Sequence, residues 1–434
     1  MTRRNRRYLF FLREYNDIDN ITPAIHFLLQ AEPDAVADLI YYRGYLPDRD
    51  ENIAHLRSTF GPRLREVHLV RVAEAYLDEV YGEGRKRFII GRFLSDHERY
   101  TAEDRRAVIE RALQSSGGVE PALGVFDQIR APEISGITPV LQAMGIPLVA
   151  LPVSPLVNVN TMRMDRFTDR SLSLSAESRG IGFMHDYSCF ERVVFTDDIY
   201  LTWLKRYFES EGQPFPLEAR AVTLGSLRFC PEWLPIRNTF QPPWELAHDG
   251  PKLVFFLSNA KNNAFWDELQ RTFTFLSHYP ELKIAVKPHT RNMDFRLPEG
   301  CGNMTLVSHV PSSSLIEWAD AVMVWGSSVA VEAFCRRKTV LYLRFLHANL
   351  SIFEHFQAGW ILRCRDELKY ALEDLIRDRT IRPYERANVD RLLRCVVQGS
   401  VDRPVPERYV EFLQSSCREV GPAEAAPGGR SLAR

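Results

Sequence analysis

The chain has 434 residues, with 55 basic and 56 acidic side chains and a formal net charge of −1. This length exceeds one compact core and fits two domains of roughly 200 residues each, and the charge balance excludes a general attraction to nucleic acid. With 45% hydrophobic residues the composition is globular, and no apolar stretch of the sequence is long enough to span a bilayer.

Cysteine usage and the N-terminus predict a cytoplasmic protein. The seven cysteines show no CxxC spacing, which indicates reduced thiols and neither a disulfide framework nor a zinc site. Residues 1–7 are basic, but the apolar run behind them is too short for a signal peptide. This basic end either caps an edge strand or makes a peripheral contact with an anionic inner membrane.

The first half of the chain alternates apolar runs with helical patterns, which is typical of a parallel α/β domain. Tyr8 to Leu12 is predicted to be the first strand, and Ile21 to Leu29 the first helix. The polar loop between them carries Asp17 and Asp19. Either carboxylate could take a proton in catalysis if burial raised its pKa; alternatively, Asp19 or Asn20 caps the helix.

Two further polar residues follow predicted strands in this half. Asp127 ends the strand over residues 123–126, so it either faces a substrate or fixes its loop by accepting backbone N–H bonds. Arg228 follows the strand over residues 221–224, in the passage GSLRF. Its planar guanidinium can bind a phosphate or carboxylate bidentately, or it can form a structural salt bridge.

Prolines accumulate between residues 231 and 251 and mark the domain boundary. We therefore assign residues 1–235 to an N-terminal domain, 236–251 to a linker and 252–420 to a C-terminal domain. Residues 421–434 lack apolar periodicity and are predicted to form a disordered tail.

The second domain is predicted to carry anion-binding groups at its strand ends. Ser258 and Lys261 follow the strand over residues 252–257 and open a helix, so they form either an anion cradle or a plain turn. Lys287 and His289 follow the next apolar run and could add positive charge or hydrogen-bond donors.

The clearest anion-binding pattern is the turn Gly326-Ser327-Ser328, which opens a predicted helix over residues 329–335. Glycine permits the tight turn, and the serines present hydroxyl and backbone N–H groups. In a parallel sheet the turn and His289 would lie at the same carboxyl edge, where ligands bind. These groups predict a site for a nucleotide monophosphate or diphosphate, whereas the alternative makes Ser327 only a helix cap.

The spaced pattern of a KPH strand end, an SSxLIxxAD helix, a GSSxxxEA turn and a KTVLYL strand resembles the C-terminal domain of GT-B glycosyltransferases. Within that superfamily it is most similar to the bacterial surface-polysaccharide branch: capsular Kdo transferases, bacterial sialyltransferases and CDP-glycerol polymerases. The GSLRF passage resembles a segment near the domain junction in the same branch. The chain departs from the pattern in that its proline precedes the histidine, and Val153-Ser154 replaces a strand-end His-Gly.

The resemblance implies two Rossmann-like α/β domains that face each other across a cleft. It implies that His289, Ser327 and Ser328 hold the donor's phosphate and that Glu332 reaches its ribose, although Glu332 could also be an ordinary surface carboxylate. The donor would be a CMP-, CDP- or UDP-linked sugar or polyol, and the acceptor, held by the first domain, a bacterial surface polysaccharide or glycolipid. Asp17-Ile18-Asp19 lies in the wrong domain for a metal-holding DxD loop and no other such loop directly follows a predicted strand, so neither a metal nor a separate cofactor is expected. The alternatives are a nucleotide-sugar 2-epimerase of the same fold and a non-catalytic partner in a polysaccharide-synthesis complex.

Overall fold

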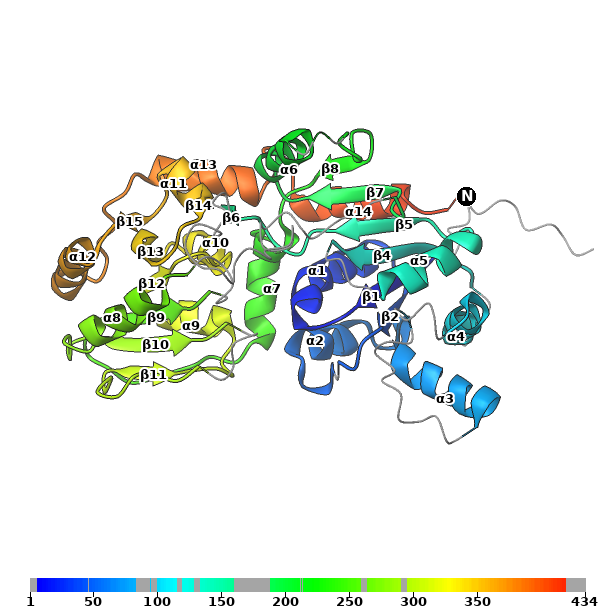
Figure 1. Cartoon of the computed structure of the whole chain (residues 1–434), viewed down its shortest axis with the longest axis horizontal. Coiled ribbons are helices and arrows are strands. Elements are labelled where there is room, and N and C mark those ends of the chain that lie inside the picture. The colour runs from blue at the N-terminus through cyan, green and yellow to red at the C-terminus, as the bar shows by residue number, and fades with distance from the viewer. Residues whose placement is uncertain are drawn as a thin grey trace, which may run out of the picture.

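A computed structural model of the protein describes residues 6–45, 47–82, 94, 100–114, 119–128, 133–159, 188–210, 212, 214–258, 264–289 and 295–418. The described residues form two parallel sheets with helices packed around them (Figure 1). Lys261, the predicted tail and residues 1–5 of the basic N-terminus lie outside the described ranges.

The first sheet has seven strands in the order β3-β2-β1-β4-β5-β7-β8, and all of its neighbours are parallel. Its strands are β1 (Arg7–Leu12), β2 (Val36–Tyr41), β3 (Leu64–His68), β4 (Pro121–Asp127), β5 (Leu148–Leu151), β7 (Arg192–Phe195) and β8 (Ala221–Thr223). The helices of this domain are α1 (Tyr15–Ala31), α2 (Glu51–Phe60), α3 (Leu69–Tyr81), α4 (Ala102–Gln114), α5 (Ile134–Ala143) and α6 (Asp198–Ser210). Every residue of β1 is buried, as expected of a strand that is covered on both faces.

The second sheet has six parallel strands in the order β11-β10-β9-β12-β13-β15. They are β9 (Lys252–Phe256), β10 (Lys283–Lys287), β11 (Met304–Leu306), β12 (Ala321–Val324), β13 (Thr339–Leu343) and β15 (Trp360–Leu362). The helices are α8 (Trp266–Leu276), α9 (Ser312–Trp318), α10 (Val329–Cys335), α11 (Ile352–Phe356), α12 (Arg365–Arg377) and α13 (Arg386–Val396). In each sheet the strand order changes direction at a central pair of strands, β1 and β4 in the first sheet and β9 and β12 in the second. This is the topology of Rossmann-like domains, so the prediction of two such domains is confirmed.

Helix α7 (Trp233–Phe240) stands between the two sheets, where the sequence predicted a domain end and a linker (Figure 1). Pro235 is its third residue and needs no N–H donor there, because the first turn of a helix has no internal partners for its N–H groups. Buried residues from both domains, including Trp233 and Phe334, belong to one hydrophobic cluster. The domains are therefore packed against each other around α7.

Two further segments connect the halves of the chain. Strand β6 (Asn158–Val159) pairs antiparallel with β14 (Leu350–Ser351). Helix α14 (Val405–Ser415), in the stretch that the sequence assigned to the second domain, packs against α1 of the first, and the Tyr409 hydroxyl donates to the carbonyl of Gly225 at 2.8 Å. The exact domain limits stay a prediction, but the last described helix lies with the first sheet (Figure 1).

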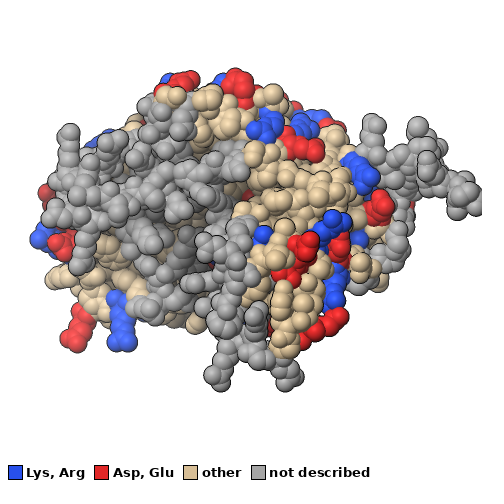
Figure 2. Space-filling model, turned by 45° about the vertical axis from the view of Figure 1, so that its right-hand side comes forward, with Lys and Arg blue, Asp and Glu red and all other residues tan. Residues whose placement is uncertain are grey.

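The described surface has mixed charge. On the face shown in Figure 2, Lys and Arg side chains are interspersed with Asp and Glu, in agreement with the balanced net charge. Among the described residues, no helix combines the length and the apolar character needed to cross a bilayer.

Candidate functional site

A cleft of about 450 Å³ lies between the two domains, and its volume is in the usual range for small-molecule sites. The first domain contributes Asn20, Tyr45, Arg49, Asp50, Glu51 and Arg228 to its lining, and the second contributes Lys287, His289, His309, Ser327 and Ser328, among others. The structure therefore brings the predicted histidine and both serines to one cavity. Their roles in binding a donor stay a prediction.

The serine turn depends on the glycine before it. Gly326 has φ +136°, a conformation that other residues rarely adopt, and a Cβ at this position would lie 2.4 Å from Nδ2 of Asn158. The Ser258 hydroxyl donates to the Gly326 carbonyl at 3.1 Å. Ser258 is buried and stabilises the turn through this hydrogen bond, and it is not among the residues that line the cleft. The two serines that follow Gly326 are thereby held at the cleft wall.

Lys287 ends β10 and fixes the neighbouring loop. Its ammonium donates to the carbonyls of Ser308 at 3.1 Å and of Val310 at 2.6 Å. Burial lowers its pKa to about 8, so the side chain is still mostly protonated at neutral pH. The loop that it holds carries His309, which lines the same cleft as His289.

Arg228 forms the predicted salt bridge and also lines the cleft, and its role as a phosphate partner stays a prediction. It lies in a short 3₁₀ turn, Leu227–Phe229, and lines the cleft. One guanidinium nitrogen is 2.5 Å from a carboxylate oxygen of buried Asp19. Asp19 therefore holds Arg228 in place at the cleft wall, and its carboxylate is already paired.

Helix α1 begins earlier than the sequence predicted, so Asp17 and Asp19 lie on the helix and not in a loop. Glu14 is the N-cap, and Asp17 accepts from the backbone N–H groups of Arg13 at 2.9 Å and Glu14 at 3.3 Å. This is a capping box in which a glutamate replaces the usual serine or threonine. Neither the predicted cap at Asp19 nor the loop before it is observed.

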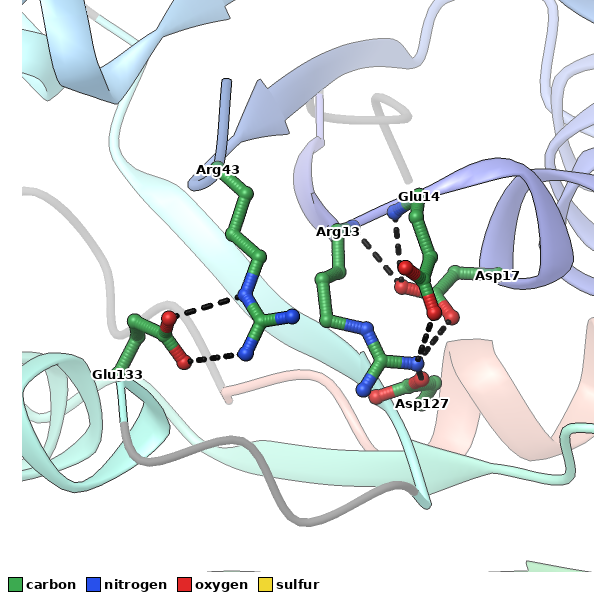
Figure 3. Close-up of polar contacts among 6 residues, drawn as sticks. All are labelled: Arg13, Glu14, Asp17, Arg43, Asp127 and Glu133. Carbon is green, nitrogen blue, oxygen red and sulfur yellow. Dashed lines mark hydrogen bonds and ion pairs between the residues drawn. The ribbon is translucent and has the colours of Figure 1, made fainter. Parts of the chain in front are cut away.

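Asp17 and Asp127 converge on the same arginine, Arg13 (Figure 3), and none of the three is among the residues that line the cleft. One guanidinium nitrogen of Arg13 lies 3.0 Å from Asp17 and 3.3 Å from Asp127. All three side chains are at most 4% exposed. Next to this cluster, Arg43 and Glu133 form a bidentate pair with distances of 2.9 and 3.0 Å. The two aspartates thus join β1, α1 and β4, and their predicted role as a base stays untested.

Glu332 is neither a surface carboxylate nor part of the cleft lining. It is 1% exposed on α10 and pairs with Arg237 of α7 and, at 2.9 Å, with Arg336. Burial alone would raise the pKa of Glu332, but attraction to the two guanidinium groups outweighs it and lowers the pKa to about 2. Glu332 thus has structural partners in Arg237 and Arg336, and its contact with a ribose stays a prediction.

The loop between β2 and α2 places further groups in the cleft that were not predicted from the sequence. Asp50 is the N-cap of α2 and accepts from the N–H groups of Asn52 at 2.9 Å and Ile53 at 3.1 Å. Its other oxygen accepts from the Tyr45 hydroxyl at 2.6 Å. Glu51 and Arg49 flank it in the lining. An aspartate directly before a helical pattern and after a strand was the available signal.

Sequence comparisons find no relative: no family model matches, and no curated protein matches. Solved structures do match. The UDP-GlcNAc 2-epimerase from Methanocaldococcus jannaschii has a TM-score of 0.52 at 13% identity, covering 94% of this chain and 99% of that one. The enzyme of that name from Neisseria meningitidis, bound to UDP-GlcNAc, has a TM-score of 0.52 at 11% identity, covering 89% and 98%.

A glycosyltransferase of kitacinnamycin also matches, at 12% identity over 96% of this chain and 100% of that one, but its TM-score is 0.49 and no argument rests on it. Identities this low establish the fold and nothing finer. The chain has the GT-B architecture of two Rossmann-like domains.

Proposed function

We propose that this chain is a GT-B glycosyltransferase that uses a nucleotide-activated sugar or polyol and acts on a bacterial surface polysaccharide or glycolipid. The observation that carries the proposal is the shared cleft, in which Lys287, His289, Ser327 and Ser328 line the wall of the second domain. Arg228 faces them from the first domain. A cytoplasmic location beside the inner membrane belongs to the same proposal.

The arrangement suits a reaction in which a phosphate leaves. As the bond between sugar and phosphate breaks, negative charge grows on the phosphate oxygens, and fixed donors and cations stabilise it. Lys287 is mostly protonated at neutral pH and is anchored by two carbonyls, so it supplies positive charge without a large reorganisation. The hydroxyls of Ser327 and Ser328 supply hydrogen bonds from the turn after β12.

A thermal-shift assay with UDP, CDP and CMP tests the proposal. A ligand at 100 times its dissociation constant stabilises the folded state by about 2.7 kcal/mol, which raises the melting temperature measurably. We expect one nucleotide to do so, and the double substitution S327A/S328A to remove most of the shift. The matched control is Ser58→Ala, on an exposed part of α2. If none of the three nucleotides stabilises the wild-type protein, a non-catalytic partner becomes the better account.

A nucleotide-sugar 2-epimerase is the second candidate, since the matching structures with TM-scores above 0.5 include enzymes of that name. It would need the same phosphate site but no acceptor. Incubation with labelled UDP-GlcNAc alone separates the two activities. A new epimer formed without any acceptor would favour the epimerase, whereas a transferase leaves the configuration at C2 unchanged.

A further inference from the structure

The first-domain wall of the cleft carries two neighbouring carboxylates, Asp50 and Glu51, at the start of α2. Both oxygens of Asp50 are occupied, one by two backbone N–H groups and the other by the Tyr45 hydroxyl. The Glu51 side chain is half-buried and makes no hydrogen bond or ion pair with any residue that the structure describes. The Asp50 carboxylate thus already accepts three hydrogen bonds, whereas the Glu51 carboxylate accepts none from the residues that the structure describes.

The other acidic candidates are occupied elsewhere. Asp17 and Asp127 are held by Arg13, and neither lines the cleft. Asp19 is paired with Arg228 at 2.5 Å. A general base must lie within hydrogen-bond reach of the proton that it removes. Because none of these three carboxylates lines the cleft, we do not assign the role of base to any of them.

We propose that Glu51 is the general base of this cleft and takes the proton of the acceptor hydroxyl. The inference rests on the proposed function, because it assumes that a donor phosphate lies against Ser327 and Ser328. The acceptor oxygen forms a bond to the anomeric carbon as its proton passes to Glu51. The bond from that carbon to the phosphate oxygen breaks, and the nucleotide leaves with the electron pair, next to Lys287.

The charges around Glu51 are consistent with this role. Burial, and then the neighbouring charge of Asp50, raise the pKa of Glu51, which makes it a better base than an ordinary surface carboxylate. The other charged or titratable groups that line the cleft are Tyr45, Arg49, Arg228, Lys287, His289 and His309. A bound phosphate adds negative charge beside Glu51 and should raise its pKa further.

Proton uptake on nucleotide binding tests this placement without knowledge of the acceptor. Calorimetry of whichever of UDP, CDP or CMP binds is carried out at pH 5.5 in two buffers that differ in ionisation enthalpy. We expect wild-type protein to take up more protons per nucleotide than Glu51→Gln, with affinities within about threefold of each other. The control is Glu103→Gln, an exposed glutamate in the first turn of α4, outside the cleft.

The possible results separate the two claims. If no nucleotide binds to the wild-type protein, the proposed function fails and the inference with it. If nucleotide binds but the proton uptake of Glu51→Gln equals that of wild type, Glu51 does not face the ligand and only the inference is overturned.

Turnover gives an independent readout. With any donor and acceptor that the wild type uses, Glu51→Gln should lower kcat by roughly 10² to 10⁴ while KM for the donor changes little. Because a base acts only when deprotonated, activity should rise with pH through the pKa of Glu51, and this acidic limb should vanish in the Gln variant. Glu51→Asp should recover part of kcat, and a kcat unchanged in Glu51→Gln would overturn the proposal.

Discussion

Gly326 is the residue on which the geometry of the serine turn depends most directly. Alanine there would be strained at φ +136° and would clash with the amide of Asn158. We expect Gly326→Ala to lower the free energy of unfolding by about 1–3 kcal/mol and to weaken nucleotide binding at least tenfold. Urea unfolding and calorimetry measure the two effects. Gly302→Ala is the control, because φ at Gly302 is ordinary and nothing lies within 4 Å of the added methyl group.

If Gly326→Ala bound nucleotide as tightly as wild type, the turn could not be the phosphate site. A loss of stability without a loss of affinity would show that Gly326 serves packing alone.

His26 and His55 make folding sensitive to acid. Their rings are joined by a contact of 3.1 Å between Nδ1 of His26 and Nε2 of His55, and they pack against Trp233 of α7. Burial, and then the neighbouring ring of His55, lower the pKa of His26 to about 4. The unfolded chain binds this proton near pH 6.5, so stability should fall as pH drops from 6.5 through 4, by up to about 3 kcal/mol.

The measurement is urea unfolding at pH 7 and pH 4.5 for wild type and His26→Gln. The variant should lose less stability between the two pH values, because Gln takes up no proton on unfolding. Equal losses would show that other groups account for the acid sensitivity.

At the scale of elements, Glu332 and Arg237 join the helix that follows the serine turn to the helix between the domains. Both side chains are 1% exposed. Glu332→Ala should cost roughly 3–5 kcal/mol, because it leaves the Arg237 guanidinium buried with one carboxylate fewer. The double substitution R237M/E332L should restore much of that loss. Thermal or urea unfolding measures both, and a double variant less stable than Glu332→Ala would contradict this account.

The elements that could be predicted from the sequence were those whose own residues form a clear hydrophobic pattern. Continuous apolar runs predicted β1 and β9 nearly to the residue. The start of α1 was missed because glutamate is a rare N-cap. Helix α7 was taken for a linker because Pro235 sits in its first turn, and α14 was missed because its position depends on packing against α1.

For the whole molecule, the rule that ligands bind at the carboxyl ends of parallel strands located the second-domain wall of the cleft. It predicted Lys287, His289 and the serine turn, because parallel strands place their carboxyl ends at one edge of a sheet. It could not select Glu51, because the sequence does not say which loop of the first domain faces that edge. Nor could it show that Glu332 is paired, since Arg237 lies in the segment that resembled a linker.

The path of the chain predicts how the two halves depend on each other. Helix α14 lies after the second sheet in the sequence but buries Val405, Tyr409, Phe412 and Leu413 in the cluster that includes α1. Each such side chain contributes about 1.5–3 kcal/mol when buried, so removing residues 404–434 should destabilise the first domain by several kcal/mol. Amide hydrogen exchange should then rise in α1 and in β8, where Arg408 now donates to the Thr223 carbonyl at 2.9 Å.

Removing only residues 421–434 is the control and should leave exchange in α1 unchanged. If the longer deletion also left α1 protected, α14 would be a passive addition to the first domain. If the longer deletion instead raised exchange mainly in the second sheet, α14 would stabilise the domain that directly precedes it in the sequence. The structure argues against both of these outcomes, because α14 contacts α1 and the end of β8 with the turn after it.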